Sequence, residues 1–137
     1  MSELFRQDIT KKFKEELKGM LTSETLINSI KVEFIAYVEY LTLDELYPDD
    51  TKEQIKEAND KLDRCDTVLF CAEIKVSNGY VSGVNSLGGC HYDSYQQFID
   101  EGGYLNDMFM QAFKGFFIEF DEMLSFSTTV ISESNNE

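Results

Sequence analysis

The sequence predicts a small α+β domain: an antiparallel sheet of three to four strands with helices packed on one face. Two observations predict the sheet. Apolar residues alternate between Ile30 and Leu41, and a second alternating run, Val68 to Val76, leads through Asn78-Gly79 into a further extended run. The second pattern is typical of a β-hairpin. Elsewhere apolar residues recur at spacings of three and four, as on one face of an amphipathic helix.

Before the hairpin, the chain is predicted to hold two helices and one strand. Apolar residues from Leu4 to Leu21 are spaced for an amphipathic helix that begins near Ser2. The strand between Ile30 and Leu41 follows, and then a loop with one helical turn that is broken at Pro48. A second helix is predicted from Thr51 to Cys65, because Thr51 and Gln54 have the spacing of a capping box.

After the hairpin, the segment from Leu87 to Tyr92 is predicted to be a turn or an irregular crossing. Asp93 or Ser94 then caps a short helix that ends at Gly102-Gly103. A longer helix is expected from about Tyr104 to Leu124, followed by a strand-like segment from Ser125 to Val130. The predicted order is therefore α-β-α-β-β-α-α, with residues 1–131 as a single domain and residues 132–137 as a polar flexible tail.

Charge is the most informative property of the sequence. The chain has 12 Lys and Arg against 26 Asp and Glu, a net charge of −14, and nearly all of the excess lies after residue 31. Direct nucleic-acid binding is disfavoured because phosphate contacts need a basic surface, and an anionic membrane is disfavoured for the same reason. The acidity favours a basic partner protein, although solubility alone would also explain it.

The cytoplasm is the predicted location. No stretch approaches the roughly 20 apolar residues that a membrane helix needs, and the N-terminus lacks the order of a signal peptide. The three cysteines, Cys65, Cys71 and Cys90, are an odd number, which favours reduced thiols over a disulfide framework.

The sequence predicts no catalytic site, no metal site and no cofactor. His91 is the only histidine and directly follows Cys90, so in an extended chain the two side chains point to opposite sides. The cysteines lack the paired spacing of a zinc site. The Gly88-Gly89 pair before a helix resembles a phosphate-binding turn, but no lysine or arginine lies near it to share the charge.

An acidic and aromatic surface is the predicted binding site. Residues 93–137 hold nine acids against Lys114 alone, together with many Tyr and Phe side chains. A protein inhibitor that occupies a basic nucleic-acid groove needs this combination. The predicted contacts are Asp100, Glu101, Asp107, Glu119, Asp121 and Glu122, with Tyr95 and Tyr104 as anchors.

The stretch LGGCHYDSYQQFIDEGGYLNDM, residues 87–108, resembles the closing segment of small acidic accessory proteins from phages and mobile elements of Gram-positive bacteria. Size, acidity and the α+β layout are similar to those of anti-CRISPR and other anti-defence inhibitors. The resemblance implies a non-enzymatic protein that blocks a host defence protein by nucleic-acid mimicry. No functional residue is transferred from those families.

Two other functions fit the same sequence. An immunity protein would use the acidity to neutralise a basic nuclease toxin. A nucleotide-binding module would use the Gly88-Gly89 turn and the aromatic residues near it. The broad apolar face of the last helix also allows a homodimer.

Overall fold

Residues 2–135 are described by the computed structural model, with side chains described for residues 2–125. One antiparallel sheet has the strand order β1-β2-β3-β4. The strands are β1 (Glu3–Asp8), β2 (Lys31–Val38), β3 (Val68–Ser77) and β4 (Ser82–Tyr92). The helices are the 3₁₀ helix η1 (Thr10–Phe13), α1 (Lys14–Met20), α2 (Glu24–Ser29), α3 (Leu43–Leu46), α4 (Lys52–Asp63), α5 (Tyr95–Glu101) and α6 (Leu105–Asn135). The predicted α+β class is confirmed.

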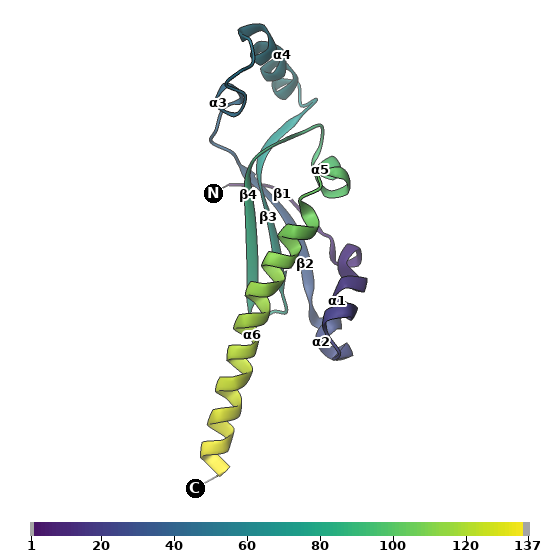
Figure 1. The fold of residues 1–137 in the computed structure, drawn as a ribbon, viewed down its shortest axis with the longest axis vertical. Coiled ribbons are helices and arrows are strands. Elements are labelled where there is room, and N and C mark those ends of the chain that lie inside the picture. Colours follow the sequence, from purple (N-terminus) through teal and green to yellow (C-terminus); the bar gives the residue numbers. More distant parts are fainter. Residues whose placement is uncertain (1, 136–137) are drawn as a thin grey trace.

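The molecule is elongated, with the sheet in its middle (Figure 1). Helices α1, α2, α5 and α6 cover one face of the sheet, as predicted. Helices α3 and α4 lie beyond one end of the sheet, and the C-terminal half of α6 projects past the opposite end (Figure 1). The elements at the two ends of the molecule therefore pack against the sheet less than the helices in its middle do.

Alternating side chains of the central strands form the core. Val32, Phe34 and Ala36 of β2 and Phe70 and Ile74 of β3 are almost fully buried, as the period of two in a strand requires. Phe98 of α5 lies 5.6 Å, centroid to centroid, from both Phe34 and Phe70. The short helix α5 is fixed to the sheet by this aromatic cluster.

The helix predicted from Ser2 to Leu21 is wrong in its first half. Residues Glu3–Asp8 form β1, which pairs with β2 in antiparallel register, and helical structure begins only at Thr10. Local spacing favoured a helix, but pairing with the edge of β2 satisfies the backbone and directs Phe5 toward Phe34. A further helix that was not predicted, α2, is capped by Ser23, whose hydroxyl accepts the Leu26 amide hydrogen at 3.2 Å.

Two predictions after the hairpin are also corrected. The segment from Leu87 to Tyr92 is the second half of β4, because a bulge opposite Cys71 absorbs the extra glycine and lets pairing continue. The strand-like segment predicted from Ser125 is helical, since the backbone of α6 stays helical to Asn135. The domain boundary predicted at residue 131 stays a prediction, and residues 136–137 of the predicted tail lie outside the described residues.

The hairpin turn and the helix caps agree with the predictions made from the sequence. The β3–β4 hairpin turns at Asn78-Gly79, where Gly79 has a φ of 91°. Both halves of the capping box form in α4, with Thr51 and Gln54 exchanging hydrogen bonds. Ser94 caps α5, and the single helical turn α3 precedes Pro48.

A glycine contact sets the position of α6 over the sheet. A Cβ atom on Gly83 of β4 would lie 2.1 Å from the Ala112 carbonyl oxygen and 2.3 Å from the Phe116 nitrogen. Only glycine permits this approach of strand and helix backbones. Gly115 faces the same point, so the last helix crosses β4 near the start of the strand.

Candidate functional site

The six acids predicted to form one binding surface lie in two groups. Asp100 and Glu101 end α5, and Asp107 lies in the first turn of α6. Glu119, Asp121 and Glu122 lie about 18 to 22 Å further along α6, at about 1.5 Å per residue. All six are exposed, but this separation divides the predicted surface.

The first group is partly compensated by internal contacts. A carboxylate oxygen of Asp100 lies 3.3 Å from the ammonium group of Lys12, and both Asp100 oxygens accept hydrogen bonds from the Gln96 side chain. These contacts lower the pKa of Asp100, and the Gln96 hydrogen bonds are the largest single cause. A carboxylate that is already partnered is a weaker binding group for another protein.

The second group lies on a helix surface that is both acidic and apolar. We name residues Phe117–Leu124 the distal α6 surface. Phe117 is 43% exposed, Ile118 60% and Leu124 47%. No lysine or arginine of the described chain forms an ion pair with its three acids, Glu119, Asp121 and Glu122.

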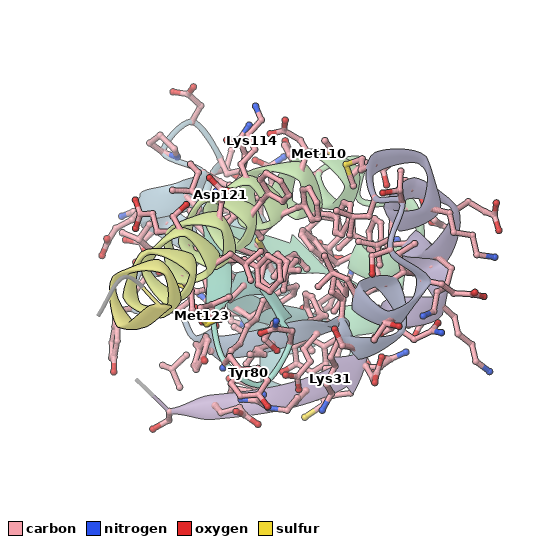
Figure 2. The ribbon with its side chains drawn as sticks, turned by 90° about the horizontal axis from the view of Figure 1, so that it is seen from below. Lys31, Tyr80, Met110, Lys114, Asp121 and Met123 are labelled. Carbon is pink, nitrogen blue, oxygen red and sulfur yellow. The ribbon has the colours of Figure 1, made fainter. Side chains whose placement is uncertain are left out.

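The side chains of α6 divide between its two sides. Seen along the molecule, Lys114 and Asp121 point away from the sheet, whereas Met123 lies on the side that faces it (Figure 2). Phe116 and Phe120 stack at 5.8 Å between ring centroids and continue the core outward. The apolar face of α6 thus runs past the end of the sheet that covers it.

The two tyrosines predicted as anchors differ in environment. Tyr95 stacks on Phe5 at 4.7 Å and contacts Phe70 edge-on at 5.0 Å, and its burial raises the pKa of its phenol. Tyr104 is 53% exposed in the connection between α5 and α6. Tyr95 is engaged in packing within the protein, whereas the ring of Tyr104 is accessible.

The Gly88-Gly89 turn holds a carboxylate of the protein itself. Gly89 adopts a φ of 66°, and its amide hydrogen is donated to Glu39, which follows β2. Glu39 also accepts hydrogen bonds from the Leu41 amide at 3.0 Å and from the Cys71 thiol at 3.2 Å. The backbone geometry of an anion-binding turn is therefore present, but Glu39 occupies the position of the anion.

Sequence reasoning missed Glu39 because its partner lies fifty residues away and no local spacing joins them. Burial raises the pKa of Glu39, but the hydrogen bonds from Leu41, Gly89 and Cys71 outweigh it, so the pKa is lowered. The carboxylate is ionised at neutral pH and would repel a phosphate. This arrangement weakens the nucleotide-binding alternative.

Two of the three thiols, those of Cys71 and Cys90, have the properties of structural cysteines, whereas Cys65 is exposed. Burial raises the pKa of Cys90 to about 11, and burial together with the hydrogen bond to Glu39 raises that of Cys71. Both thiols are therefore largely protonated at neutral pH, and a thiol is a weak nucleophile in that form. Cys90 pairs with Phe70 on the core side, so Cys71, the next residue of β3, lies on the opposite face of the sheet.

His91 joins two loops to β4. Its Nδ1 atom lies 3.2 Å from the Tyr47 hydroxyl, and its Nε2 atom lies 3.2 Å from the Thr67 hydroxyl. Burial lowers the pKa of the imidazole, which favours the neutral ring at physiological pH. Both ring nitrogens are used to hold the segment containing α3 and α4 against β4.

A hollow of about 530 Å³ lies between α4 and the end of β4. Several polar side chains that line it already have partners within the protein: the Gln54 side chain accepts the Thr51 amide hydrogen, Lys61 lies 3.9 Å from Glu57, and the Gln97 side chain accepts the Asp93 amide hydrogen. Few free groups converge on the hollow to orient a ligand. Among the described side chains, no three His, Cys, Asp or Glu residues are grouped to hold a metal ion.

Comparison of the chain with protein-family models, curated protein sequences and solved structures gives no match. Within the described residues, no helix combines the length and the apolar character needed to cross a membrane. The distal α6 surface is thus identified from its own geometry and charge.

Proposed function

We propose that this chain is a non-enzymatic acidic inhibitor that binds a basic, nucleic-acid-binding host defence protein, in the manner of anti-CRISPR proteins. It would act in the cytoplasm of a bacterial host. The observation that carries the proposal is the distal α6 surface, where exposed apolar side chains lie among three acids and no lysine or arginine occurs between residues 117 and 124.

The acidic and the apolar side chains of that surface contribute to binding in different ways. Carboxylates that recur along a helix present negative charge to lysines and arginines that otherwise hold phosphates, which accelerates encounter. Phe117, Ile118 and Leu124 add area that leaves water when the complex forms. Apolar contacts at the centre of an interface with charges around them are typical of protein partners.

An experiment can test whether binding depends on the position of the three acids and not only on the net charge of the protein. Glu119, Asp121 and Glu122 are replaced together by lysine, and a matched variant carries lysine at Glu16, Glu53 and Asp63, which are also exposed. The two variants have the same net charge and differ only in where the change lies. Tagged proteins are used for pull-down from a bacterial lysate at low and then high salt, with mass spectrometry of the captured proteins.

We expect the unmodified chain and the matched variant to recover one basic nucleic-acid-binding protein, which high salt releases. Three fewer phosphate-like contacts should reduce recovery by the distal α6 variant at least about tenfold. Equal loss in both variants would mean that general acidity, and not this surface, attracts the partner. Recovery of no basic protein by the unmodified chain would refute the proposed function.

A further inference from the structure

The two edges of the sheet differ in how they are protected against pairing with another strand. The outer edge strand β1 carries Glu3, Arg6 and Asp8 and has an irregular register between Glu3 and Phe5. The Arg6 guanidinium binds Glu3 at 2.8 Å and Glu33 at 2.9 Å. Charges, short length and bulges are the devices that prevent strand addition at an edge.

The opposite edge strand, β4, lacks charged residues over most of its length. The run from Ser82 to Cys90 contains no charged residue and no proline, in a chain of which 28% is charged. Val84 is 53% exposed. From Ser82 to the bulge at Gly88-Gly89 the strand offers about 20 Å of regular backbone.

Hairpin geometry shows which backbone groups face outward from this edge. The Asn78 amide donates to the Val81 carbonyl across the turn at 3.3 Å, so this pair is hydrogen-bonded. Antiparallel pairs alternate between hydrogen-bonded and open pairs, which makes Val76–Gly83 a bonded pair and Lys75–Val84 an open one. The N–H and C=O groups of Ser82, Val84 and Ser86 therefore point away from β3, and β4 is the last strand of the sheet.

One acid of the distal α6 surface lies beside this edge. Glu119 lines a hollow of about 290 Å³ with Tyr80 and Ser82, at the turn end of β4. Lys75 lies there too, but the chain as a whole carries a charge of −14. An incoming strand with lysines or arginines is attracted to this position, whereas a second copy of the chain is repelled.

We infer that the edge of β4 between Ser82 and Leu87 binds an extended, basic segment of the partner by strand addition. The inference rests on the proposed function for the class of partner. Main-chain hydrogen bonds to Ser82, Val84 and Ser86 would supply the contact, and Glu119 would favour basic side chains at one end. The edge and the distal α6 surface share Glu119, so they form one continuous binding region.

The test uses a seven-residue peptide with blocked ends, Thr-Lys-Val-Lys-Thr-Lys-Val, and a control peptide in which each lysine is replaced by glutamate. Hydrogen exchange of the uniformly labelled protein is followed by NMR. The basic peptide should slow exchange of the Ser82, Val84 and Ser86 amides by about tenfold or more, and the acidic peptide should not. Absence of protection at these three amides would overturn the inference.

Substitutions of Val84 by proline and by threonine give a test variant and its control. Val84→Pro removes one outward N–H without removing a donor from the β3 pairing, whereas Val84→Thr keeps the N–H and a β-branched side chain. We expect Val84→Pro to weaken binding of the basic peptide about tenfold and Val84→Thr to bind normally. Ser86→Pro provides the same test if Val84→Pro does not fold. Unchanged affinity in a folded proline variant would contradict strand addition.

Two further outcomes separate this inference from the proposed function and from self-association. A captured host protein that binds Val84→Pro as well as the unmodified chain would refute the edge site and leave the proposed function standing. Protection of the three edge amides by the peptide, without capture of any basic protein, would support the edge site and refute the proposed function. If sedimentation shows a dimer that Val84→Pro dissociates, the edge binds a second copy and the inference is wrong.

Discussion

Gly83 controls the distance between the last helix and the sheet. A methyl group at this position would lie within 2.3 Å of backbone atoms of Ala112 and Phe116, which cannot move independently of α6. We expect Gly83→Ala to lower the free energy of unfolding by about 3 kcal/mol, as overpacking of a core does. Urea unfolding measures the difference.

The control for Gly83 is another glycine of the same protein. Gly19 lies in α1 with no atom within 4 Å of the position of its Cβ. Gly19→Ala should stabilise the protein by about 0.5 kcal/mol, because alanine favours the helix. Equal effects of the two substitutions would show that α6 does not depend on the close approach.

Glu39 gives the fold a pH dependence with a defined sign. Its hydrogen bonds lower its pKa in the folded protein below the ordinary value of 4.5, despite burial. The stabilisation is therefore fully present above that value and is lost as the pH falls through the lower pKa of the folded state. We expect Glu39→Gln to cost about 1.5 kcal/mol at neutral pH and much less in acid.

Urea unfolding across the acidic range tests this dependence. Glu101→Gln is the comparison, because Glu101 is exposed on α5. Its substitution should change stability little at any pH. A constant difference between Glu39→Gln and the unmodified protein down to strongly acidic pH would show that the charge of Glu39 does not stabilise the turn.

Helix α4 is an element whose stability is local. None of its residues is buried, and its first turn depends on the capping box of Thr51 and Gln54. Thr51→Ala should cost the helix about 1 kcal/mol and speed exchange of its amides about fivefold. Global unfolding in urea should be unchanged, since α4 contributes no side chain to the core.

Ser94→Ala is the matched cap substitution. Ser94 accepts the Gln97 amide hydrogen at 3.0 Å, and α5 places Phe98 and Ile99 in the core. The same loss of about 1 kcal/mol should therefore appear in global unfolding. If Thr51→Ala lowers global stability to the same extent, α4 unfolds together with the sheet.

These elements also show where sequence reasoning succeeds. The hairpin at Asn78-Gly79 and the caps at Thr51 and Ser94 were predictable, because each depends on residues within a few positions of one another. Strand β1 was not, because its inward positions include Gln7, and its pairing with β2 joins residues far apart in the sequence. Tertiary pairing outweighs local propensity in such cases.

The candidate site divides in the same way. The acids of α6, with Lys114 as the one basic residue after position 92, were visible in the sequence. The packing of Tyr95 on Phe5 and the contact of Glu39 with Gly89 depend on distances between elements. No spacing within one segment could reveal them.

The net negative charge of the whole molecule destabilises the fold but favours binding to a basic partner. A net charge of −14 repels itself in the folded state, and salt screens this repulsion over distances beyond about 8 Å at physiological ionic strength. Raising NaCl from about 0.02 M to about 0.5 M should increase the free energy of unfolding by about 1 kcal/mol. The increase should disappear near the isoelectric point of about 4.3 that the composition implies, where little net charge is left to screen.

Binding to a basic partner should respond to the same salt in the opposite sense. Attraction between opposite charges steers encounter, so screening should lower the association rate while the isolated protein becomes more stable. Parallel unfolding and binding measurements over one salt series therefore separate loss of affinity from loss of fold. A fold that salt weakens would mean that ion pairs such as Arg6–Glu33 outweigh the net repulsion, and weaker binding could then no longer be assigned to the interface alone.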